Sequence, residues 1–323
     1  MKRILLLHTG GTIAMKEDKN TGSVSPEGEN PLQESLSSLN QIANIESEEV
    51  FQLPSPHITH KEMFLLKKRI EQASQTEQVD GVVITHGTDT LEETAYFLDL
   101  TLNAGIPIVI TGAMRSSNEI GSDGPYNLLS SVKVAASNDA ANKGVLVVLN
   151  DEIHTAKNVT KTHTSNVSTF QSPQYGPIGI VTKRGVFFHH YPMYRENYDI
   201  QEIKNRVMLI KAYAGMDSTL LYGLKSMNIN GLVIEALGQG NLPPAMIPGI
   251  KELLQHNIPI VLVSRCFNGI VQDTYSYDGG GRQLKDFGVI FSNGLSGQKA
   301  RIKLMVALEK TKEFSELQKL FLE

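Results

Sequence analysis

Short apolar runs alternate along the chain with longer stretches in which apolar residues recur at helical spacing. The runs at residues 3–8, 48–53, 81–86, 107–111 and 144–149 predict strands, most of them without alternation of apolar and polar positions. The stretches at 61–75, 89–103 and 124–138 predict helices, and in the second of these Leu91, Ala95, Leu98 and Leu102 form one stripe. Alternation of strand and helix predicts a parallel sheet covered on both faces.

A second series of the same kind follows. It has predicted strands at 206–211, 231–235 and 259–263, helices at 218–227 and 244–255, and two closing helices at 297–310 and 313–321. The segment 189–205 is polar, holds a proline and interrupts this rhythm. The sequence therefore predicts an α/β protein with a larger N-terminal, mostly parallel-sheet domain at 1–190, a linker at 191–205 and a smaller C-terminal α/β domain at 206–323.

Composition narrows the class of protein. The 323 residues are 41% hydrophobic and 20% charged, which is typical of a globular protein. No apolar run approaches the ~20 residues that cross a bilayer, and the run at 4–7 is too short for a signal-peptide core, so we expect a cytoplasmic protein with no membrane contact. A single cysteine, Cys266, excludes an intrachain disulfide, and the net charge of −4 argues against nucleic acid as a partner.

In open α/β sheets, ligands bind beyond the carboxyl ends of the strands, where loops lead into helices. The first such loop, HTGGT at 8–12, has adjacent glycines that let the backbone turn sharply and approach a ligand. That geometry would expose Thr12 beside amide hydrogens able to stabilise an oxyanion, although a simple strand-ending turn also explains the glycines. A phosphate loop is disfavoured because the GxxxxGK[ST] and GxGxxG spacings are absent. The polar stretch 15–31 that follows predicts a mobile flap.

The second loop, THGTDT at 85–90, joins a predicted buried strand to a helix. Five of its six residues carry a hydroxyl, imidazole or carboxylate. Thr88 or Asp89 could cap the helix, but capping needs only one such residue, so the cluster favours a functional site. We expect His86 to be a hydrogen-bonded packing residue.

The third loop, NVTKTHT at 158–164, places Lys161 among threonines. An exposed strand edge is the ordinary setting for such a lysine. A lysine held near hydroxyls can instead be desolvated, which lowers its pKa and lets it act as a base. The local sequence is compatible with both interpretations.

A histidine–carboxylate metal site is the alternative chemistry. Six histidines lie near predicted strand ends beside acidic residues: His8, His57, His60, His86, His154 and His163. No HxxxH or HxH pair occurs near the three loops, and His57 and His60 lie in a proline-rich loop rather than on a clear helix face. We therefore expect no metal.

Taken together, the loops resemble the bacterial-type L-asparaginase family. LHTGGTIA at 7–14 and GVVITHGTDTL at 81–91 are similar to its two signatures. The resemblance continues in order through GAMR at 112–115, SDGP at 122–125, VTKT at 159–162, GQGNL at 238–242 and QKAR at 298–301. It implies a larger and a smaller α/β domain and hydrolysis of L-asparagine to L-aspartate and ammonia with neither a metal nor an organic cofactor. The missing signal peptide favours the cytoplasmic type I branch.

The resemblance also implies roles for individual residues. Thr12 would be the nucleophile that attacks the side-chain amide and forms an acyl-enzyme. Thr88, Asp89 and Lys161 would form the second catalytic group, with Lys161 as base and Thr88 orienting or activating water. Asp89 would also hold the α-amino group of the substrate.

Further positions would contact the substrate. Ser55 would hold the α-carboxylate, with Gly11 and Pro56 also at the binding site, and Ala113 would offer its carbonyl to the leaving amide. Asn241 would reach the site of a neighbouring subunit, which implies a homodimer or homotetramer.

The sequence departs from the family pattern at two places. The flap usually supplies a tyrosine beside the nucleophile, but TGSVSP at 21–26 contains none. Lys161 would then serve both steps, or Tyr275 or Tyr277 of the C-terminal domain would replace the missing group. Pro56 stands where periplasmic members carry a glutamine, which removes a side-chain contact and alters the preference between asparagine and glutamine.

Three other functions are considered. An ammonia-donating subunit of a tRNA-dependent amidotransferase is disfavoured because such subunits carry an additional N-terminal domain, whereas this chain begins close to its first strand. The missing flap tyrosine is compatible with a catalytically disabled regulator that binds asparagine. A metal-dependent amidohydrolase is the third.

Overall fold

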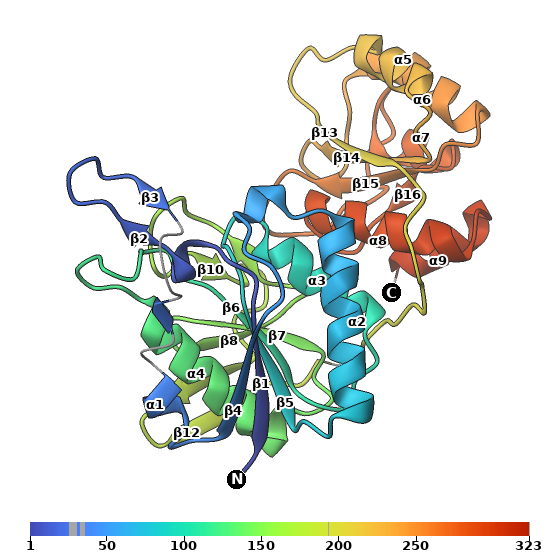
Figure 1. Ribbon diagram of the computed structural model, residues 1–323. Coiled ribbons are helices and arrows are strands. Elements are labelled where there is room, and N and C mark those ends of the chain that lie inside the picture. The colour runs from blue at the N-terminus through green and yellow to red at the C-terminus, as the bar shows by residue number, and fades with distance from the viewer. Residues whose placement is uncertain (26–30, 33–35, 193, 323) are drawn as a thin grey trace. The chain divides into compact units, whose positions relative to one another are not determined.

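Runs of valine, isoleucine and leucine form the centre of an eight-stranded sheet in a computed structural model of the chain, with the order β12-β11-β8-β7-β6-β5-β1-β4 (Figure 1). The parallel strands are β1 (Arg3–His8), β4 (Asn44–Glu49), β5 (Gly81–Thr85), β6 (Ile108–Thr111) and β7 (Val145–Leu149). Every residue of β5, β6 and β7 is buried, which explains why these strands lack an alternating pattern.

The structure describes residues 1–25, 31–32, 36–192 and 194–322, and it divides into two compact units, Met1–Asn197 and Tyr198–Glu323. The eight-stranded sheet belongs to the first unit. A four-stranded parallel sheet, β13-β14-β15-β16, belongs to the second. The predicted fold class, a larger mostly parallel α/β domain followed by a smaller α/β domain, is confirmed.

Helices cover both faces of the first sheet. Helix α4 (Gly124–Ala136) lies on one face, where Leu128 and Val132 join Ile4, Leu6 and Val83 in one apolar core. Helices α2 (His60–Thr76) and α3 (Leu91–Thr101) cover the other face (Figure 1). Burial of these apolar stripes is what holds the strand ends, and the loops that follow them, in place.

The predicted strand at 48–53 is wrong in position, because the strand is β4 at Asn44–Glu49. Its sequence NIESEE is largely exposed at the edge of the sheet and pairs with β1 on one side only, so it carries no apolar run. Helix α3 begins two residues later than predicted, after Thr90, which makes no side-chain capping bond. Neither Thr88 nor Asp89 is the N-cap.

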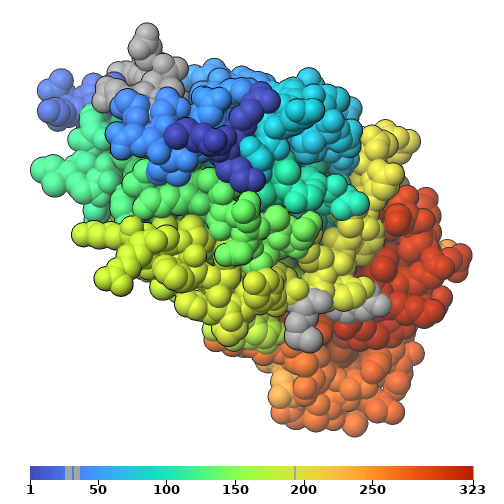
Figure 2. Space-filling model, turned by 90° about the horizontal axis from the view of Figure 1, so that it is seen from below, coloured from blue at the N-terminus to red at the C-terminus, as the bar shows by residue number. Residues whose placement is uncertain are grey.

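Three antiparallel strands extend the sheet beyond the prediction: β8 (Glu152–Thr155), β11 (Gly179–Thr182) and β12 (Gly185–Phe188). Each has four residues, and its apolar run is at most three residues long, as in GVFF of β12, so the runs are too short to predict a strand. In Figure 2 the yellow-green atoms of this end of the sheet lie at the surface beside the green atoms of α4, which packs against both β11 and β12.

The second unit repeats the strand–helix alternation. Its sheet consists of β13 (Val207–Lys211), β14 (Gly231–Ala236), β15 (Ile260–Ser264) and β16 (Ile290–Phe291). Helices α5 (Thr219–Ser226) and α6 (Ile247–Gln255) pack together on one side, and α8 (Gly297–Lys310) packs against the strands from the other, followed by α9 (Phe314–Leu322) (Figure 1). β16 and the short helix α7 (Gly281–Asp286) were not predicted.

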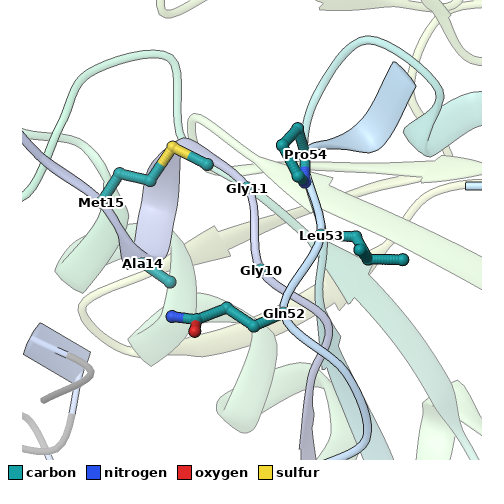
Figure 3. A pocket seen from close by; sticks show the side chains of 7 residues that line it. All are labelled: Gly10, Gly11, Ala14, Met15, Gln52, Leu53 and Pro54. Atoms are coloured by element: carbon teal, nitrogen blue, oxygen red, sulfur yellow. The ribbon is translucent and has the colours of Figure 1, made fainter. Parts of the chain in front are cut away.

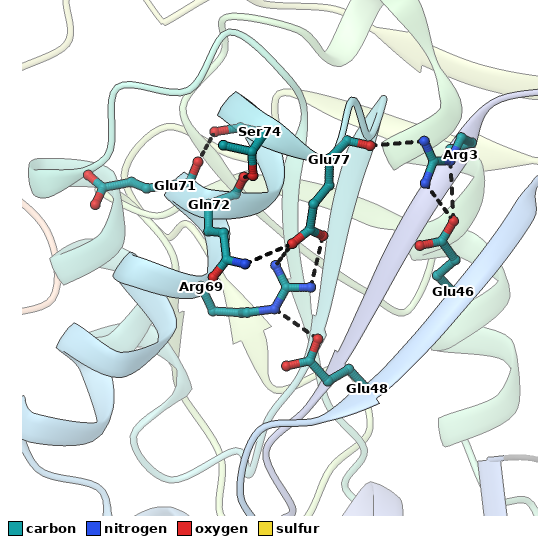
Figure 4. Close-up of polar contacts among 9 residues, drawn as sticks. Arg3, Glu46, Glu48, Arg69, Glu71, Gln72, Ser74 and Glu77 are labelled. Atoms are coloured by element: carbon teal, nitrogen blue, oxygen red, sulfur yellow. Dashed lines mark hydrogen bonds and ion pairs between the residues drawn. The ribbon is translucent and has the colours of Figure 1, made fainter.

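Ion pairs fasten the edge strand β4 to the body of the first unit (Figure 4). The Arg69 guanidinium, from α2, donates to Glu48 at 2.8 Å and to Glu77 at 3.0 Å. Arg3 of β1 donates to Glu46 at 2.8 Å and to the backbone carbonyl of Glu77 at 2.9 Å. These pairs compensate the negative charge of the strand, whose position is set by its parallel pairing with β1.

Within the predicted flap, β2 (Lys16–Glu17) and β3 (Val24–Ser25) form a two-stranded hairpin, while residues 26–30 lie outside the described part. The side-chain amide of Asn118 donates to the carbonyl of Glu17 and accepts from its N–H, each at 2.8 Å. Among the described helices, none is long and apolar enough to cross a membrane.

Candidate active site

The first two loops meet because the strands that carry them are neighbours. In the parallel register of β1 and β5, His8 lies opposite Thr85, so the loops that follow the two strands leave the sheet at the same edge. The N–H and the hydroxyl of Thr9 both donate to the carbonyl of Thr85, at 3.2 and 2.8 Å. Residues 9–12 and 86–90 are therefore packed side by side.

Glycines make this packing possible. Gly11 has φ +83°, and a Cβ there would lie 2.3 Å from the Cα of Gly87. Gly10 has φ +97°, and its Cβ would lie 2.6 Å from backbone atoms of Leu53. Only glycine tolerates both the positive φ and the contact. Figure 3 shows a pocket between the first loop and residues 52–54, lined by Gly10, Gly11, Ala14, Met15, Gln52, Leu53 and Pro54.

Thr12 is half-buried and begins a single 3₁₀ turn, Thr12–Ala14, directly after this pair of glycines. Among the described residues, none forms a hydrogen bond with its hydroxyl. The side chain is thus held next to the packed loops with its oxygen unengaged, as a nucleophile awaiting substrate would be.

Lys161 is brought to the second loop by the two-residue strand β9 (Thr160–Lys161), which pairs with β10 (Phe170–Gln171). Its Nζ donates to Thr88 Oγ1 at 2.9 Å and to Asp89 Oδ1 at 2.7 Å. Thr88 is 7% exposed and the Lys161 side chain 16%, whereas the Asp89 side chain is 60% exposed. The three residues form one polar cluster whose carboxylate is open to solvent.

Ser55 joins the cluster from the 3₁₀ turn Ser55–His57. Its buried hydroxyl accepts from the backbone N–H of Asp89 at 3.2 Å, and its carbonyl accepts from the hydroxyl of Thr90 at 2.8 Å. The Thr90 hydroxyl is used here, which leaves α3 without a side-chain cap. Pro56, the next residue, is exposed.

Ala113 follows β6 and is buried next to the second loop. A Cβ on Gly112 would lie 2.7 Å from the carbonyl oxygen of His86 and 3.1 Å from Thr88 Cγ2. The carboxylate of Asp123 accepts from the N–H groups of Met114 and Arg115, both at 3.0 Å.

Asn127 completes the support of this turn. Its side-chain amide donates to the Gly112 carbonyl and to Asp123, each at 3.0 Å. No role was predicted for Asp123 or Asn127, although SDGP at 122–125 marks the start of α4.

Glu92 is a further residue that the sequence analysis missed. It is 5% exposed in the first turn of α3. Its Oε1 accepts from the hydroxyl of Thr160 and from the backbone N–H of Lys161, each at 3.1 Å. Nothing local in the sequence distinguishes it from an ordinary glutamate near a helix N-terminus.

The buried histidines are engaged in hydrogen bonds within the protein. Burial lowers the pKa of both His8 and His86 to about 4. His8 contacts the hydroxyls of Thr85 and Ser47, at 2.9 and 3.1 Å. In the described part of the chain, no group of three or more histidine, cysteine or acidic side chains is arranged to hold a metal.

The remaining predicted positions lie in the second unit. Asn241 accepts from the N–H of Gly281 at 3.1 Å through its Oδ1. Tyr275 and Tyr277 are exposed, with ring centroids 5.5 Å apart.

The fold and the polar cluster define a class of protein: a two-domain α/β protein in which a lysine is hydrogen-bonded to a threonine and an aspartate beyond the strand ends. Residues 3–194 match the family model for the asparaginase N-terminal domain, and residues 206–321 match that for the glutaminase/asparaginase C-terminal domain. The chain belongs to the asparaginase family.

Relatives cover the chain almost completely. It is 35% identical to an L-asparaginase of Bacillus licheniformis, over 97% of each chain, and 40% identical to a probable L-asparaginase of Deinococcus radiodurans, over 95% of this chain and 93% of the relative. The solved structure of a probable cytoplasmic L-asparaginase from Campylobacter jejuni matches over 100% of each chain, with a TM-score of 0.89 and 33% identity.

Proposed function

We propose that this protein hydrolyses the side-chain amide of L-asparagine to L-aspartate and ammonia through a threonine acyl-enzyme. The observation that carries the proposal is the bonding of Lys161 Nζ to both Thr88 and Asp89, at 2.9 and 2.7 Å, beside the loop that presents Thr12. Membership of the asparaginase family across both domains supports the choice of reaction.

In the first half-reaction, the Thr12 oxygen attacks the amide carbon and its proton passes to a base. The tetrahedral oxyanion collapses, and the C–N bond breaks once the leaving nitrogen is protonated, which releases ammonia and leaves an aspartyl ester on Thr12. In the second half-reaction, Thr88 orients a water molecule and Lys161 accepts its proton. Attack of this water on the ester releases aspartate and restores the Thr12 hydroxyl.

Substrate binding needs groups that complement a small zwitterion. The largely exposed carboxylate of Asp89 suits the α-ammonium group, and Ser55 lies beside it to receive the α-carboxylate. In the same proposal Gly11, Pro56 and the Ala113 carbonyl border the bound amide. Under this proposal the flap predicted at 15–31, of which residues 26–30 lie outside the described part, shields the site from bulk water while the acyl-enzyme forms.

We further propose that the enzyme works in the cytoplasm as a homodimer or homotetramer in which Asn241 reaches a neighbouring subunit's site. A solved structure similar to this chain is that of a probable cytoplasmic L-asparaginase, which supports the cytoplasmic part of this proposal. The oligomer is tested by light scattering of the purified chain together with the activity of Asn241→Ala: a fully active monomer contradicts this part.

Ammonia release from L-asparagine and L-glutamine, measured side by side, tests the reaction. We expect Thr12→Ala and Lys161→Met each to lower the rate on asparagine by about 100-fold or more, because they remove the nucleophile and the base. Lys225→Met, which breaks the half-exposed pair of Lys225 with Glu252 in the second unit, is the matched control and should keep the wild-type rate.

The absence of a tyrosine from TGSVSP at 21–26, which leaves Thr12 without the usual activating group, favours one rival, a regulator that binds asparagine without hydrolysing it. In that case asparagine raises the melting temperature of the wild-type protein, but no ammonia is released. Ammonia release by wild type that is lost in Thr12→Ala excludes the rival.

A further inference from the structure

We propose that Glu92 is a positioning residue for Lys161: it fixes the backbone of β9 against α3 so that the lysine amine reaches Thr88 and Asp89. This inference rests on the proposed function, since it concerns the base of that reaction. The Glu92 contacts that carry the inference are with the Thr160 hydroxyl and the Lys161 backbone N–H rather than with the lysine amine.

One carboxylate oxygen joins the two segments that form the cluster. Oε1 of Glu92 accepts from Thr160 Oγ1 and from the N–H of Lys161, both at 3.1 Å, across 68 and 69 positions of sequence. Glu92 follows Thr88 and Asp89 by only four and three residues. Lys161 and its two partners, Thr88 and Asp89, are therefore all held at the N-terminal end of α3.

The strand that carries Lys161 needs such an anchor. β9 has two residues, and its ladder partner is the equally short β10, with Lys161 opposite Phe170. A lysine side chain has four rotatable carbons, so the reach of Nζ is set by where its backbone is held. Loss of the anchor would displace the amine from bonds that are only 2.7 and 2.9 Å long.

Helix stability alone does not account for this glutamate. An acid in the first turn favours the helix dipole, but Glu93 already occupies that turn. Burying a second carboxylate, with 5% exposure, costs free energy unless its oxygens are bonded. The contacts that repay this cost include the two donors on β9.

The test compares three variants by steady-state ammonia release from asparagine. Glu92→Ala should lower kcat by about 100-fold, the effect of a displacement of about 1 Å in a catalytic group, while KM changes by less than about threefold. Glu92→Gln keeps an oxygen that can accept both bonds, so its kcat should stay within about threefold of wild type. Thr160→Val removes one donor at constant volume and should give an intermediate kcat.

Glu62→Ala is the matched control. Glu62 also lies in the first turn of a helix, α2, and its carboxylate accepts from the hydroxyl and the backbone N–H of one residue, Thr59. Its removal should lower the melting temperature and leave kcat unchanged. If damage to any helix N-terminus slowed turnover, Glu62→Ala would also lower kcat. That result would overturn the inference.

The Lys161→Met background separates positioning from a structural role. With the amine gone, Glu92→Ala should reduce the residual rate no further, whereas an equal fractional loss in both backgrounds overturns the inference. Wild-type kcat in Glu92→Ala overturns it while the proposed function stands. A wild-type protein that releases no ammonia overturns both. If Glu92→Ala does not fold, a Thr160→Val variant at wild-type kcat is the contradicting result.

Discussion

His86 is buried between the second loop and helix α3, and both of its ring nitrogens have partners. A carbonyl oxygen can only accept, so Nδ1, 2.8 Å from the Gly87 oxygen, carries the hydrogen and donates it. Nε2 then accepts from the hydroxyl of Thr94 at 2.9 Å. The prediction of a hydrogen-bonded packing residue is confirmed, and the bond to Gly87 holds the turn on which Thr88 sits.

Neutral burial of His8 and His86 makes stability depend on pH. Their pKa values of about 4 in the folded state lie below the usual 6.5 of the unfolded chain, because burial disfavours the charged form. Between pH 6.5 and 4 the unfolded chain binds protons that the folded chain does not. The free energy of unfolding should therefore be highest above pH 6.5 and fall towards pH 4, by about 3 kcal/mol for each histidine.

Urea unfolding at half-unit pH steps checks this expectation. His86→Gln should reduce the slope between pH 6.5 and 4 by close to half. His256→Gln removes an exposed histidine and should leave the slope unchanged. A wild-type protein equally stable at pH 7 and pH 4.5 contradicts the argument.

At the scale of single residues, the sequence predicted the members of the polar cluster but not Glu92, which holds the backbone of Lys161. The crowding of hydroxyl and carboxylate groups at 85–90 pointed to Thr88 and Asp89, and the resemblance added Lys161. Glu92 could not be found in this way, because its bonds cross 68 and 69 positions and a glutamate near a helix start is common.

Among the elements, the loops after β1, β5 and β6 owe their proximity to glycine. Gly11→Ala would place a Cβ 2.3 Å from Gly87 at a φ of +83°, and we expect it to lower the free energy of unfolding by more than about 3 kcal/mol. Gly215 has a similar φ of +78° with no atom within 4 Å of its Cβ position, so Gly215→Ala should cost only about 1 kcal/mol of backbone strain.

Urea midpoints and ammonia release of both variants check this prediction. Gly215→Ala should keep the wild-type rate, whereas Gly11→Ala should lose activity even where it remains folded, because the second loop must move. Equal destabilisation by the two substitutions would show that the close approach of the loops is unimportant.

Prediction of the elements succeeded where burial was uniform. β5, β6 and β7 are buried along their whole length and stood out as apolar runs. β4 was misplaced because an edge strand is half-exposed and its carboxylates are compensated by Arg3 and Arg69, from elements distant in sequence. β8, β11 and β12 were missed since each has only four residues, too few to show a period.

On the scale of the whole molecule, each unit has a core of its own. The apolar core around α4 in the first unit and that between α5, α6 and the four-stranded sheet in the second are built from different residues. No helix or strand occurs among the described residues between Phe188 of β12 and Val207 of β13. The linker proposed at 191–205 falls within this stretch.

Brief trypsin treatment tests the linker. Arg195, Lys204 and Arg206 lie in or just after it, and the Lys204 side chain is 70% exposed. We expect early cleavage at one of these residues to give two fragments that resist further digestion, identified by mass spectrometry. Replacing all three by glutamine should suppress this cut, and fragments that end elsewhere in the chain's centre would place the boundary differently.

The bond from Lys161 to Thr88 joins positions 73 apart, and the strand that carries this lysine pairs with Phe170–Gln171, which follow it in the chain. During protein synthesis, Thr12, Thr88 and Asp89 leave the ribosome well before Lys161, the base of the proposed reaction. Unfinished chains and early-terminated products would thus contain the proposed nucleophile, Thr12, without the proposed base, Lys161. Consumption of the free amino acid, itself a precursor for translation, would begin only once the first unit has been made in full.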